Sequence, residues 1–159
     1  MAGAEVTHVD AAKNIVVWAR RNAELSSLAE APIRWIAEDA TKYVERELRR
    51  GNRYDAAILD PPSYGHGVRG EVWRLAEDLP RLLSLSAELT DVQPGFVLLT
   101  CHTPGYSAAT LRKMVATAWS SLRSEQIEVG RLDLPSATGR VLPSGEVVRA
   151  GGGRQLLLS

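Results

Sequence analysis

Residues 54–65 read YDAAILDPPSYG, and this stretch decides the fold class. Its centre, AAILD at 56–60, is a short apolar run, which is typical of a parallel strand that is buried on both faces. Pro61 and Pro62 end the strand because neither ring nitrogen can donate to a sheet ladder. The stretch therefore predicts a buried strand that stops at an acid, Asp60.

Two strand-then-helix units are predicted before this stretch. Residues 5–10 (EVTHVD) alternate weakly and end in an acid, which indicates a short strand. An amphipathic helix follows and ends near Asn22, because apolar side chains recur along one helical face. Residues 33–39 (IRWIAED) again favour a strand, and residues 40–50 have helical spacing until Gly51 ends the helix. Strand and helix therefore alternate along this half of the chain.

A glycine-rich loop is predicted directly after the double proline, over residues 63–70. We expect a helix from Glu71 that is interrupted at Pro80, since a proline ring suits the first turn of a helix and not its interior. Asp78 would cap the new helix that begins there.

The remainder of the chain changes from parallel to antiparallel character. Residues 96–100 (FVLLT) form another apolar run, and Ser107 is placed to cap the clearest amphipathic helix of the sequence. Residues 127–134 and 141–150 then resemble two strands that are joined through Pro143-Ser144-Gly145, and this is a hairpin and not a crossover.

The order of these elements predicts the fold class. We expect a single α/β domain over residues 1–159, with a doubly wound, mostly parallel sheet and a C-terminal antiparallel hairpin. Ligands of such sheets bind beyond the carboxyl ends of the strands. Asp10, Asp39, Asp60 and Cys101 all follow predicted strands, so we expect these four side chains to converge on one crevice.

Composition excludes several functional classes. Lysine and arginine number 19 and so do aspartate and glutamate, so no net field attracts nucleic acid or an acidic surface, and any contact with nucleic acid must be local. The single cysteine excludes an internal disulfide. The first residues have no apolar leader, and no apolar run approaches the roughly 18 residues of a membrane helix. We therefore expect a cytoplasmic protein without a membrane partner.

The double-proline turn is the strongest candidate for chemistry. Because two backbone donors are missing, the Asp60 carboxylate and the carbonyls near Pro61 and Pro62 form rigid acceptors that suit an amino group or an ammonium. The planar ring of Tyr64 could stack on a base. The alternative is that Asp60 caps a turn and the prolines only stop the strand.

Three segments in this order resemble class I S-adenosylmethionine-dependent methyltransferases. They are VTHVDAAKN at 6–14, AEDA at 37–40 and YDAAILDPPSYG at 54–65. More narrowly, they are similar to the branch that modifies bases of large-subunit ribosomal RNA, which includes the C5-cytosine enzymes. The resemblance covers nearly the whole chain, and it implies an RNA substrate and S-adenosylmethionine as cofactor.

The resemblance also implies a cofactor site. In that family the acid after the second strand binds the ribose hydroxyls of the cofactor. The corresponding residue here is Asp10, with Ala11 beside it. The acid after the third strand approaches the adenine amino group of the cofactor. The corresponding residue here is Asp39, with Ala40 beside it. Asp60 follows the fourth strand, where methyl donor and base meet. From the residues alone, Asp10 is equally well explained as a helix cap.

The same resemblance places the substrate site at Pro61 and Pro62, beside the Tyr64 ring that could stack on a base, and it gives Asp60 and Cys101 as catalytic residues. The C5 atom of cytosine is a poor nucleophile until a thiolate adds to C6, so C5 chemistry requires a cysteine at the base. His102 would be a neighbouring proton carrier. The alternative is that a lone cysteine is a small buried hydrophobe.

The chain departs from this family at its start, where the strand and glycine-rich turn that hold the cofactor are not found. In the family that strand is central, so its loss would leave two sheet edges exposed, through which copies of the chain could form a homo-oligomer. Three hypotheses follow: a fragment of a longer RNA methyltransferase, a non-catalytic binding module with this fold, or a methyltransferase of exocyclic nitrogens that does not use Cys101.

Several other patterns carry less information. Gly65-x-Gly67-x-x-Gly70 matches a dinucleotide fingerprint, but it follows a turn and not the first strand, so flexibility over the site is the better interpretation. The histidines lack metal-ligand spacing, and we expect no metal. An arginine cluster suits either phosphate or a solvated helix face: Arg46, Arg49, Arg50 and Arg53.

Overall fold

The computed structural model describes residues 3–66, 70, 72–90 and 95–151. Their elements follow in the order β1 Val6–Asp10, α1 Lys13–Leu25, β2 Ile33–Ala37, α2 Ala40–Arg49, β3 Ala56–Leu59, β4 Tyr64–His66, β5 Val72–Arg74, α3 Leu75–Leu89, β6 Phe96–Cys101, α4 Ala108–Ala118, a 3₁₀ turn Ser124–Gln126, β7 Ile127–Pro135 and β8 Val141–Ala150.

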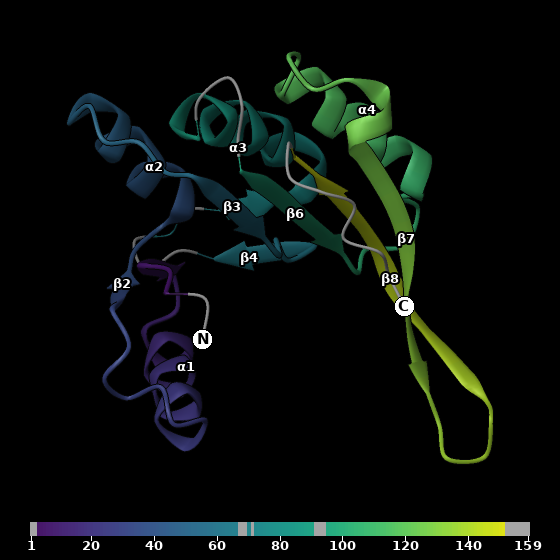
Figure 1. The fold of residues 1–159 in the computed structure, drawn as a ribbon, viewed down its shortest axis with the longest axis horizontal. Helices are drawn as coiled ribbons and strands as arrows, with labels where there is room; N and C mark the ends of the chain where they lie inside the picture. Colours follow the sequence, from purple (N-terminus) through teal and green to yellow (C-terminus); the bar gives the residue numbers. More distant parts are fainter. Residues whose placement is uncertain (1–2, 67–69, 71, 91–94, 152–159) are drawn as a thin grey trace.

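The strands form two parallel pairs and an antiparallel extension. β1 is parallel to β2, and β3 is parallel to β6 in a second sheet of order β3-β6-β8-β7. β8 runs antiparallel to both of its neighbours and forms a long hairpin with β7. Helices α2, α3 and α4 lie along one face of the strands and α1 lies on the other (Figure 1). The predicted α/β class with a C-terminal hairpin is confirmed.

Helix caps explain where two of the helices begin. The Asp39 carboxylate accepts the backbone N–H of Lys42 at 2.9 Å, and Ser107 Oγ accepts that of Thr110 at 3.2 Å. Each bond satisfies one of the four donors that an α-helix leaves unpaired at its start. The cap predicted at Ser107 is therefore confirmed, while Asp39 has a capping role that the sequence analysis did not assign.

The main core lies between the second sheet and helices α3 and α4. Leu79, Leu99, Leu111 and Val115 are fully buried there, together with Trp119. The indole N–H of Trp119 donates to Thr90 Oγ1 at 3.0 Å, so the one polar atom of this ring is satisfied. No helix within the described ranges is long and apolar enough to cross a membrane.

The segment after the double proline differs from the prediction. Tyr64–His66 and Val72–Arg74 pair as an antiparallel hairpin, β4–β5, where a loop and then a helix from Glu71 were expected; residue 71 itself lies outside the described residues. Helix α3 begins only at Leu75. The Trp73 indole N–H donates to the Pro62 carbonyl at 2.8 Å, so this hairpin is fastened to the double-proline turn.

The predicted break at Pro80 is also wrong. Helix α3 continues through Pro80. Because Pro80 lies only six positions into the helix, it removes one early backbone hydrogen bond and does not end the helix. Asp78 accepts the backbone N–H of Arg74 at 2.7 Å, so it supports the start of α3 and does not cap a second helix.

The turn of the C-terminal hairpin lies elsewhere than predicted. It falls at residues 136–140, where Ser136 N–H donates to the Arg140 carbonyl at 2.8 Å. Pro143-Ser144-Gly145 lies inside β8, opposite a register shift between Leu132 and Asp133. Gly145 is required for close approach, since a Cβ there would lie 2.4 Å from the Cys101 carbonyl oxygen.

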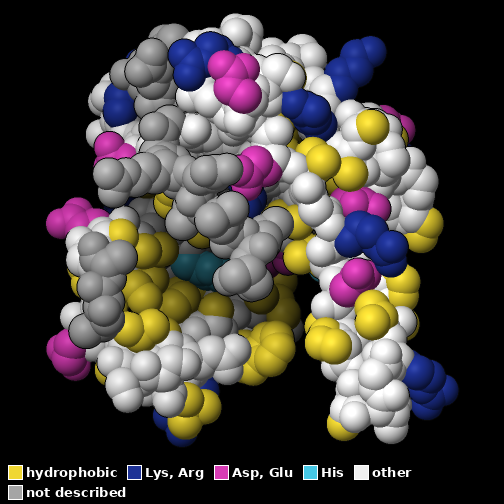
Figure 2. Space-filling model, turned by 45° about the vertical axis from the view of Figure 1, so that its right-hand side comes forward, with side chains coloured by type: hydrophobic (Ala, Val, Ile, Leu, Met, Phe, Trp, Pro, Cys, Tyr) yellow, Lys and Arg dark blue, Asp and Glu magenta, His cyan; other side chains and the backbone are white. Residues whose placement is uncertain are grey.

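The sheet is divided between β1 and β3. These two strands belong to separate ladders within the described residues. On the face opposite α2 and α3, a hollow separates the part that carries α1 from the β7–β8 hairpin, and hydrophobic side chains gather on its wall (Figure 2).

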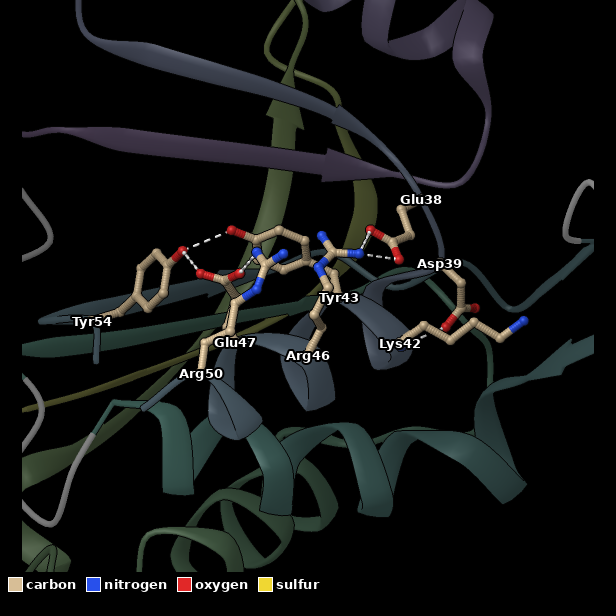
Figure 3. Close-up of polar contacts among 8 residues, drawn as sticks. All are labelled: Glu38, Asp39, Lys42, Tyr43, Arg46, Glu47, Arg50 and Tyr54. Carbon is tan, nitrogen blue, oxygen red and sulfur yellow. Dashed lines mark hydrogen bonds and ion pairs between the residues drawn. The ribbon is translucent and has the colours of Figure 1, made fainter. Parts of the chain in front are cut away.

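A buried carboxylate joins helix α2 to the start of β3. Glu47 is fully buried and accepts hydrogen bonds from Asn52 Nδ2 at 2.7 Å, Arg50 Nη1 at 3.1 Å and the Tyr54 hydroxyl at 3.1 Å. The Tyr54 and Tyr43 hydroxyls lie 2.7 Å apart (Figure 3). Because Tyr54 leads directly into β3, this network fixes the second sheet against the helix that follows β2.

The network also sets the ionisation of its members. Burial raises the pKa of Glu47, but the hydrogen bonds from Asn52, Tyr54 and Arg50 outweigh burial and hold that pKa below its ordinary value. Burial and the hydrogen bond with Tyr43 raise the pKa of Tyr54 to about 12. Glu47 is therefore an anion and Tyr54 a neutral donor near neutral pH.

We predict that Glu47→Ala lowers the free energy of unfolding by about 2–4 kcal/mol, because buried donors lose their acceptor. Glu47→Gln should cost less, since its amide oxygen still accepts. The control is Glu24→Gln on α1, whose exposed pairs with Arg20 and Arg21 should contribute less than about 1 kcal/mol. Urea titrations check all three, and equal effects of Glu47→Ala and Glu24→Gln would contradict the network.

The same variants test the pH dependence of stability. A carboxyl whose pKa is lowered on folding stabilises the native state above its unfolded pKa, and this stabilisation is lost as pH falls through the folded pKa. The native chain should therefore lose stability below about pH 4.5 more steeply than Glu47→Gln. Urea titrations at pH 3 to 6 measure the free energy of unfolding of both proteins. An equal loss of stability toward low pH in the native chain and in Glu47→Gln would show that Glu47 does not carry this dependence.

Candidate functional site

Two acids lie at the carboxyl edge of the first parallel pair. Asp10 ends β1, and its Oδ1 accepts the Ala12 N–H at 2.7 Å, while its backbone carbonyl accepts the Glu38 N–H at 3.0 Å. Asp39 follows β2 and caps α2. Each carboxylate thus accepts one backbone N–H from the segment that follows its strand, and a carboxylate can accept further hydrogen bonds. Ala11 and Ala40, the predicted neighbours, are half-buried beside them.

An ion pair that the sequence analysis missed supports this edge. The Glu38 carboxylate accepts from Arg46 Nη1 with both oxygens, and the Arg46 guanidinium lies 5.1 Å from the centre of the Tyr43 ring (Figure 3). The pair ties the β2–α2 turn to the second turn of α2, so it holds Asp39 in place. Nothing in the spacing of Glu38 and Arg46 identifies this pair before the turn is folded.

Three arginines of the cluster have local partners. Arg46 binds Glu38, Arg50 binds the buried Glu47 at 3.1 Å, and Arg53 donates to the Asn52 carbonyl at 2.9 Å. These contacts favour the interpretation of a structural and solvated helix face over that of a phosphate site.

A second polar group lies at the carboxyl edge of β3 and β6. Asp60 follows β3, and its Oδ1 accepts the hydroxyl of Thr100 in β6. His102 follows β6, with its Nε2 3.4 Å from Asp60 Oδ1 and its Nδ1 2.5 Å from the Ser144 carbonyl oxygen. The side chains of Asp60 and His102 are 65% and 48% exposed, so a ligand can reach both.

The Ser144 contact determines how His102 can carry a proton. A carbonyl oxygen only accepts, so Nδ1 must hold a hydrogen and donate it. A proton gained or released by the ring is therefore exchanged at Nε2, which faces Asp60. The His102 ring and the Asp60 carboxylate are therefore placed to act together on a ligand at this edge, with Nε2 as the proton acceptor.

The double-proline turn is fastened on both sides. Pro61 is buried, and the Pro62 carbonyl accepts from Trp73 of the β4–β5 hairpin. Ser63 Oγ and Thr103 Oγ1 lie 2.7 Å apart, which joins the turn to the segment after β6. Tyr64, at the start of β4, is 53% exposed. The turn thus presents Asp60 on a rigid support, and a partly exposed aromatic ring follows it at the start of β4.

Cys101 does not lie with this group. Its side chain is 1% exposed and packs with Val97 and Leu99, which share its face of β6 toward helices α3 and α4. Thr100 and His102 alternate with it and reach Asp60. The structure therefore brings together Asp60 and His102, and it places the thiol in the core, as the interpretation of Cys101 as a small hydrophobe expects.

Other candidates have little support. Within the described ranges, no three His, Cys, Asp or Glu side chains are placed to hold a metal ion. The His8 ring packs against Trp35 with centroids 5.3 Å apart. Gly67 of the glycine series lies outside the described residues.

No protein-family model matches the chain. Over 115 residues it is 30% identical to ribosomal RNA large subunit methyltransferase I of Aeromonas salmonicida, which covers 72% of this chain and 28% of that protein. Over 72 residues it is 36% identical to ribosomal RNA large subunit methyltransferase K/L of Cellvibrio japonicus, covering 45% of this chain and 9% of that protein.

A solved structure supports the same relationship. The chain superimposes on the SAM-dependent methyltransferase from Agrobacterium tumefaciens with a TM-score of 0.83 and 37% sequence identity, over 94% of this chain and 50% of that one. The chain is thus similar in sequence to large-subunit ribosomal RNA methyltransferases and has the fold of the SAM-dependent enzyme. It spans 28% of the first of these relatives and half of the solved chain.

We predict that the Cys101 thiol of the native chain reacts with a soluble aromatic disulfide at least about 100-fold more slowly than in the urea-unfolded chain, because the reagent cannot reach a thiol in the core. Release of the coloured thiolate measures both rates. Rates within a factor of a few of each other would mean that the thiol is accessible at the edge of β6.

Proposed function

We propose that this chain is the cofactor- and base-binding part of a longer enzyme that transfers a methyl group from S-adenosylmethionine to a base of RNA, with ribosomal RNA as the substrate class. The observation that carries the proposal is the placement of acids at one carboxyl edge of each parallel pair, Asp10 and Asp39 in one and Asp60 in the other. The similarity to the relatives supports the reaction class.

The residues of the first pair fit the nucleoside end of the cofactor. A ribose offers two hydroxyl donors, and the Asp10 carboxylate can accept both while Oδ1 keeps its bond to the Ala12 N–H. Asp39 supplies an acceptor for an adenine amino group, and Ala11 and Ala40 leave room beside the two acids. When bound, the cofactor supplies a methyl group on a positively charged sulfur.

The residues of the second pair fit a base. The Asp60 carboxylate can accept an amino or imino hydrogen, and the rigid turn at Pro61 and Pro62 holds it in place. Tyr64 offers a face on which a base can stack. Methyl transfer to a base nitrogen or to C5 releases one proton, and His102 Nε2 with Asp60 is placed to take it.

The methyl group could be transferred to either of two kinds of atom on the base. Methylation of cytosine at C5 would use Cys101 as the nucleophile, and the thiol would have to leave the core to reach C6. Methylation of an exocyclic nitrogen needs only the acceptors and the aromatic ring at the double-proline turn. The burial of Cys101 supports the exocyclic nitrogen as the second candidate, and the C5 reaction stays a proposal until the thiol is tested.

The proposal also covers partners and location. A ribosomal RNA substrate agrees with the cytoplasmic location expected from the sequence. The homo-oligomer expected from an exposed sheet edge would use β1 or β3. A non-catalytic module with this fold is the competing function, and it differs from the enzyme in binding no cofactor.

We predict that Asp10→Asn weakens binding of S-adenosylmethionine about tenfold or more, because charge-assisted hydrogen bonds to the ribose are worth about 1.5–3 kcal/mol each. Asp133→Asn on the β7–β8 hairpin is the matched control and should bind as the unaltered chain does. Equilibrium dialysis with labelled cofactor measures the affinities. Equal affinities of the two variants would remove Asp10 from the cofactor site, and a folded chain that binds no cofactor would mean that the activity belongs to a longer protein or to none.

We predict that His102→Asn lowers the rate of methyl transfer to large-subunit ribosomal RNA about 100-fold, while cofactor affinity stays within about twofold. Cys101→Ala should abolish transfer if the product is 5-methylcytosine and spare it if the product is an exocyclic methylamine. Transfer of labelled methyl groups, followed by nucleoside analysis, checks both variants. An unchanged rate for His102→Asn would show that His102 does not accept the proton.

A further inference from the structure

Strand β8 carries one extra residue close to the His102 side chain. In its ladder with β7, Gly145 pairs with Leu132 and Pro143 pairs with Asp133, so Ser144 is the residue that the register skips. An extra residue of this kind is a β-bulge, which redirects the groups around it. The Ser144 carbonyl is directed at a side chain, because its oxygen lies 2.5 Å from His102 Nδ1.

The bulge lies at the edge that carries the candidate site. Cys101, the last residue of β6, pairs with Glu146 of β8. Because β8 runs antiparallel to β6, residues 141–145 continue beyond the carboxyl end of β6, where the hairpin extends away from the sheet (Figure 1). Asp60 follows β3 at the same edge, since β3 and β6 are parallel. The hairpin thus reaches the candidate site through its backbone.

Position 145 requires glycine for this approach. Gly145 has a φ of +151°, which a residue with a side chain rarely adopts. A Cβ atom there would overlap the Cys101 carbonyl oxygen and would lie 3.0 Å from His102 Nδ1. A side chain at this position would therefore push β8 away from the end of β6 and withdraw the Ser144 carbonyl from the imidazole.

The His102 ring lies between two acceptors that compete for its hydrogen. A neutral imidazole carries one hydrogen, on either Nδ1 or Nε2. The Ser144 carbonyl oxygen lies 2.5 Å from Nδ1, whereas Asp60 Oδ1 lies 3.4 Å from Nε2, which exceeds the ordinary length of a hydrogen bond. The shorter contact is the stronger one, so the hydrogen stays on Nδ1 and Nε2 keeps its lone pair.

Packing alone would not hold the ring in this state. The His102 side chain is 48% exposed, so it can change its rotamer unless a polar contact fixes it. Without the Ser144 carbonyl, the Asp60 carboxylate would remain as the acceptor beside the ring and would draw the hydrogen to Nε2. That nitrogen would then be a donor and could not take a proton from a base.

We propose that the bulge at Ser144 and Gly145 is a positioning element that keeps His102 in the state of a proton acceptor. Gly145 is the residue that makes the contact possible, and both residues act through His102 and not on the base or the cofactor. The inference rests on the proposed function for its catalytic consequence. The tautomer of His102, in contrast, is a property of the chain itself and can be measured without cofactor or RNA.

Nitrogen NMR of the 159-residue chain, labelled with ¹⁵N-histidine, measures the tautomer. At about pH 8.5, well above the ordinary pKa of an imidazole, we expect His102 Nδ1 to resonate as a protonated nitrogen and Nε2 as an unprotonated one. The His102→Asn variant identifies these signals among those of the three histidines. A neutral His102 with its hydrogen on Nε2 in the unaltered chain would overturn the proposal, and this result does not depend on the folding of any other variant.

Gly145→Ala tests the bulge. Its Cβ should displace the Ser144 carbonyl and move the hydrogen of the neutral ring to Nε2. Gly139→Ala is the matched control, because Gly139 also has a positive φ, +79°, but a Cβ there would meet no atom within 4 Å. The control should keep the hydrogen on Nδ1, and amide spectra check that both variants are folded. A folded Gly145→Ala chain with the hydrogen still on Nδ1, or the same switch in both variants, would contradict the role of the bulge.

A double-variant cycle tests whether Gly145 acts through His102. Gly145→Ala should slow methyl transfer to within about threefold of His102→Asn, the double variant should be no slower than His102→Asn alone, and cofactor affinity should stay within about twofold. Losses that multiply in the double variant would show that Gly145 acts elsewhere and would overturn the proposal. A folded chain without methyl transfer would count against the proposed function, while the tautomers would still decide the positioning role.

Discussion

The buried carboxylate of Glu47 is the interaction on which the arrangement of this molecule depends. It receives three hydrogen bonds, and one of them comes from Tyr54 at the entrance to β3. No ladder of the described residues joins β1 to β3, so packing and polar contacts must hold the two sheets together. Because Glu47 lies on the helix that Asp39 caps, the same contact fixes the first group of acids relative to the second sheet.

The candidate site is accordingly built in two halves. In each half an acid follows a parallel strand and is held by local contacts: Asp39 by the Lys42 N–H and its neighbour Glu38 by Arg46, and Asp60 by Thr100 and His102. Each half is preorganised by short-range bonds. The distance between the halves, in contrast, depends on the Glu47 network.

Sequence patterns predicted the elements whose signal is local. The apolar run at 56–60 with its terminal acid, the alternation of strand and helix, and the serine before α4 are all set by burial or capping within a few residues. The β4–β5 hairpin escaped prediction because a tertiary contact, the bond from Trp73 to the Pro62 carbonyl, fastens it. The helix continues through Pro80 because this proline lies near the start of α3, and the sequence did not reveal where that start falls. The face of the sheet on which the Cys101 side chain lies could not be predicted, because both faces of the strand FVLLTC carry mostly apolar side chains. The role of Glu47 depends on Asn52 and Tyr54, which meet it only in the folded chain.

The central claim is that the two groups of acids form one site, in which Asp10 and Asp39 hold the cofactor and Asp60 faces the base beside the methyl group. Titration of S-adenosylmethionine into the isotope-labelled chain, followed by amide chemical shifts, tests it most directly and detects weak binding. The account predicts shifts at residues 10–12 and 38–40 and at residues 60 and 102, with none at the tip of the β7–β8 hairpin. Shifts confined to other surfaces, or none in a folded chain, would contradict it.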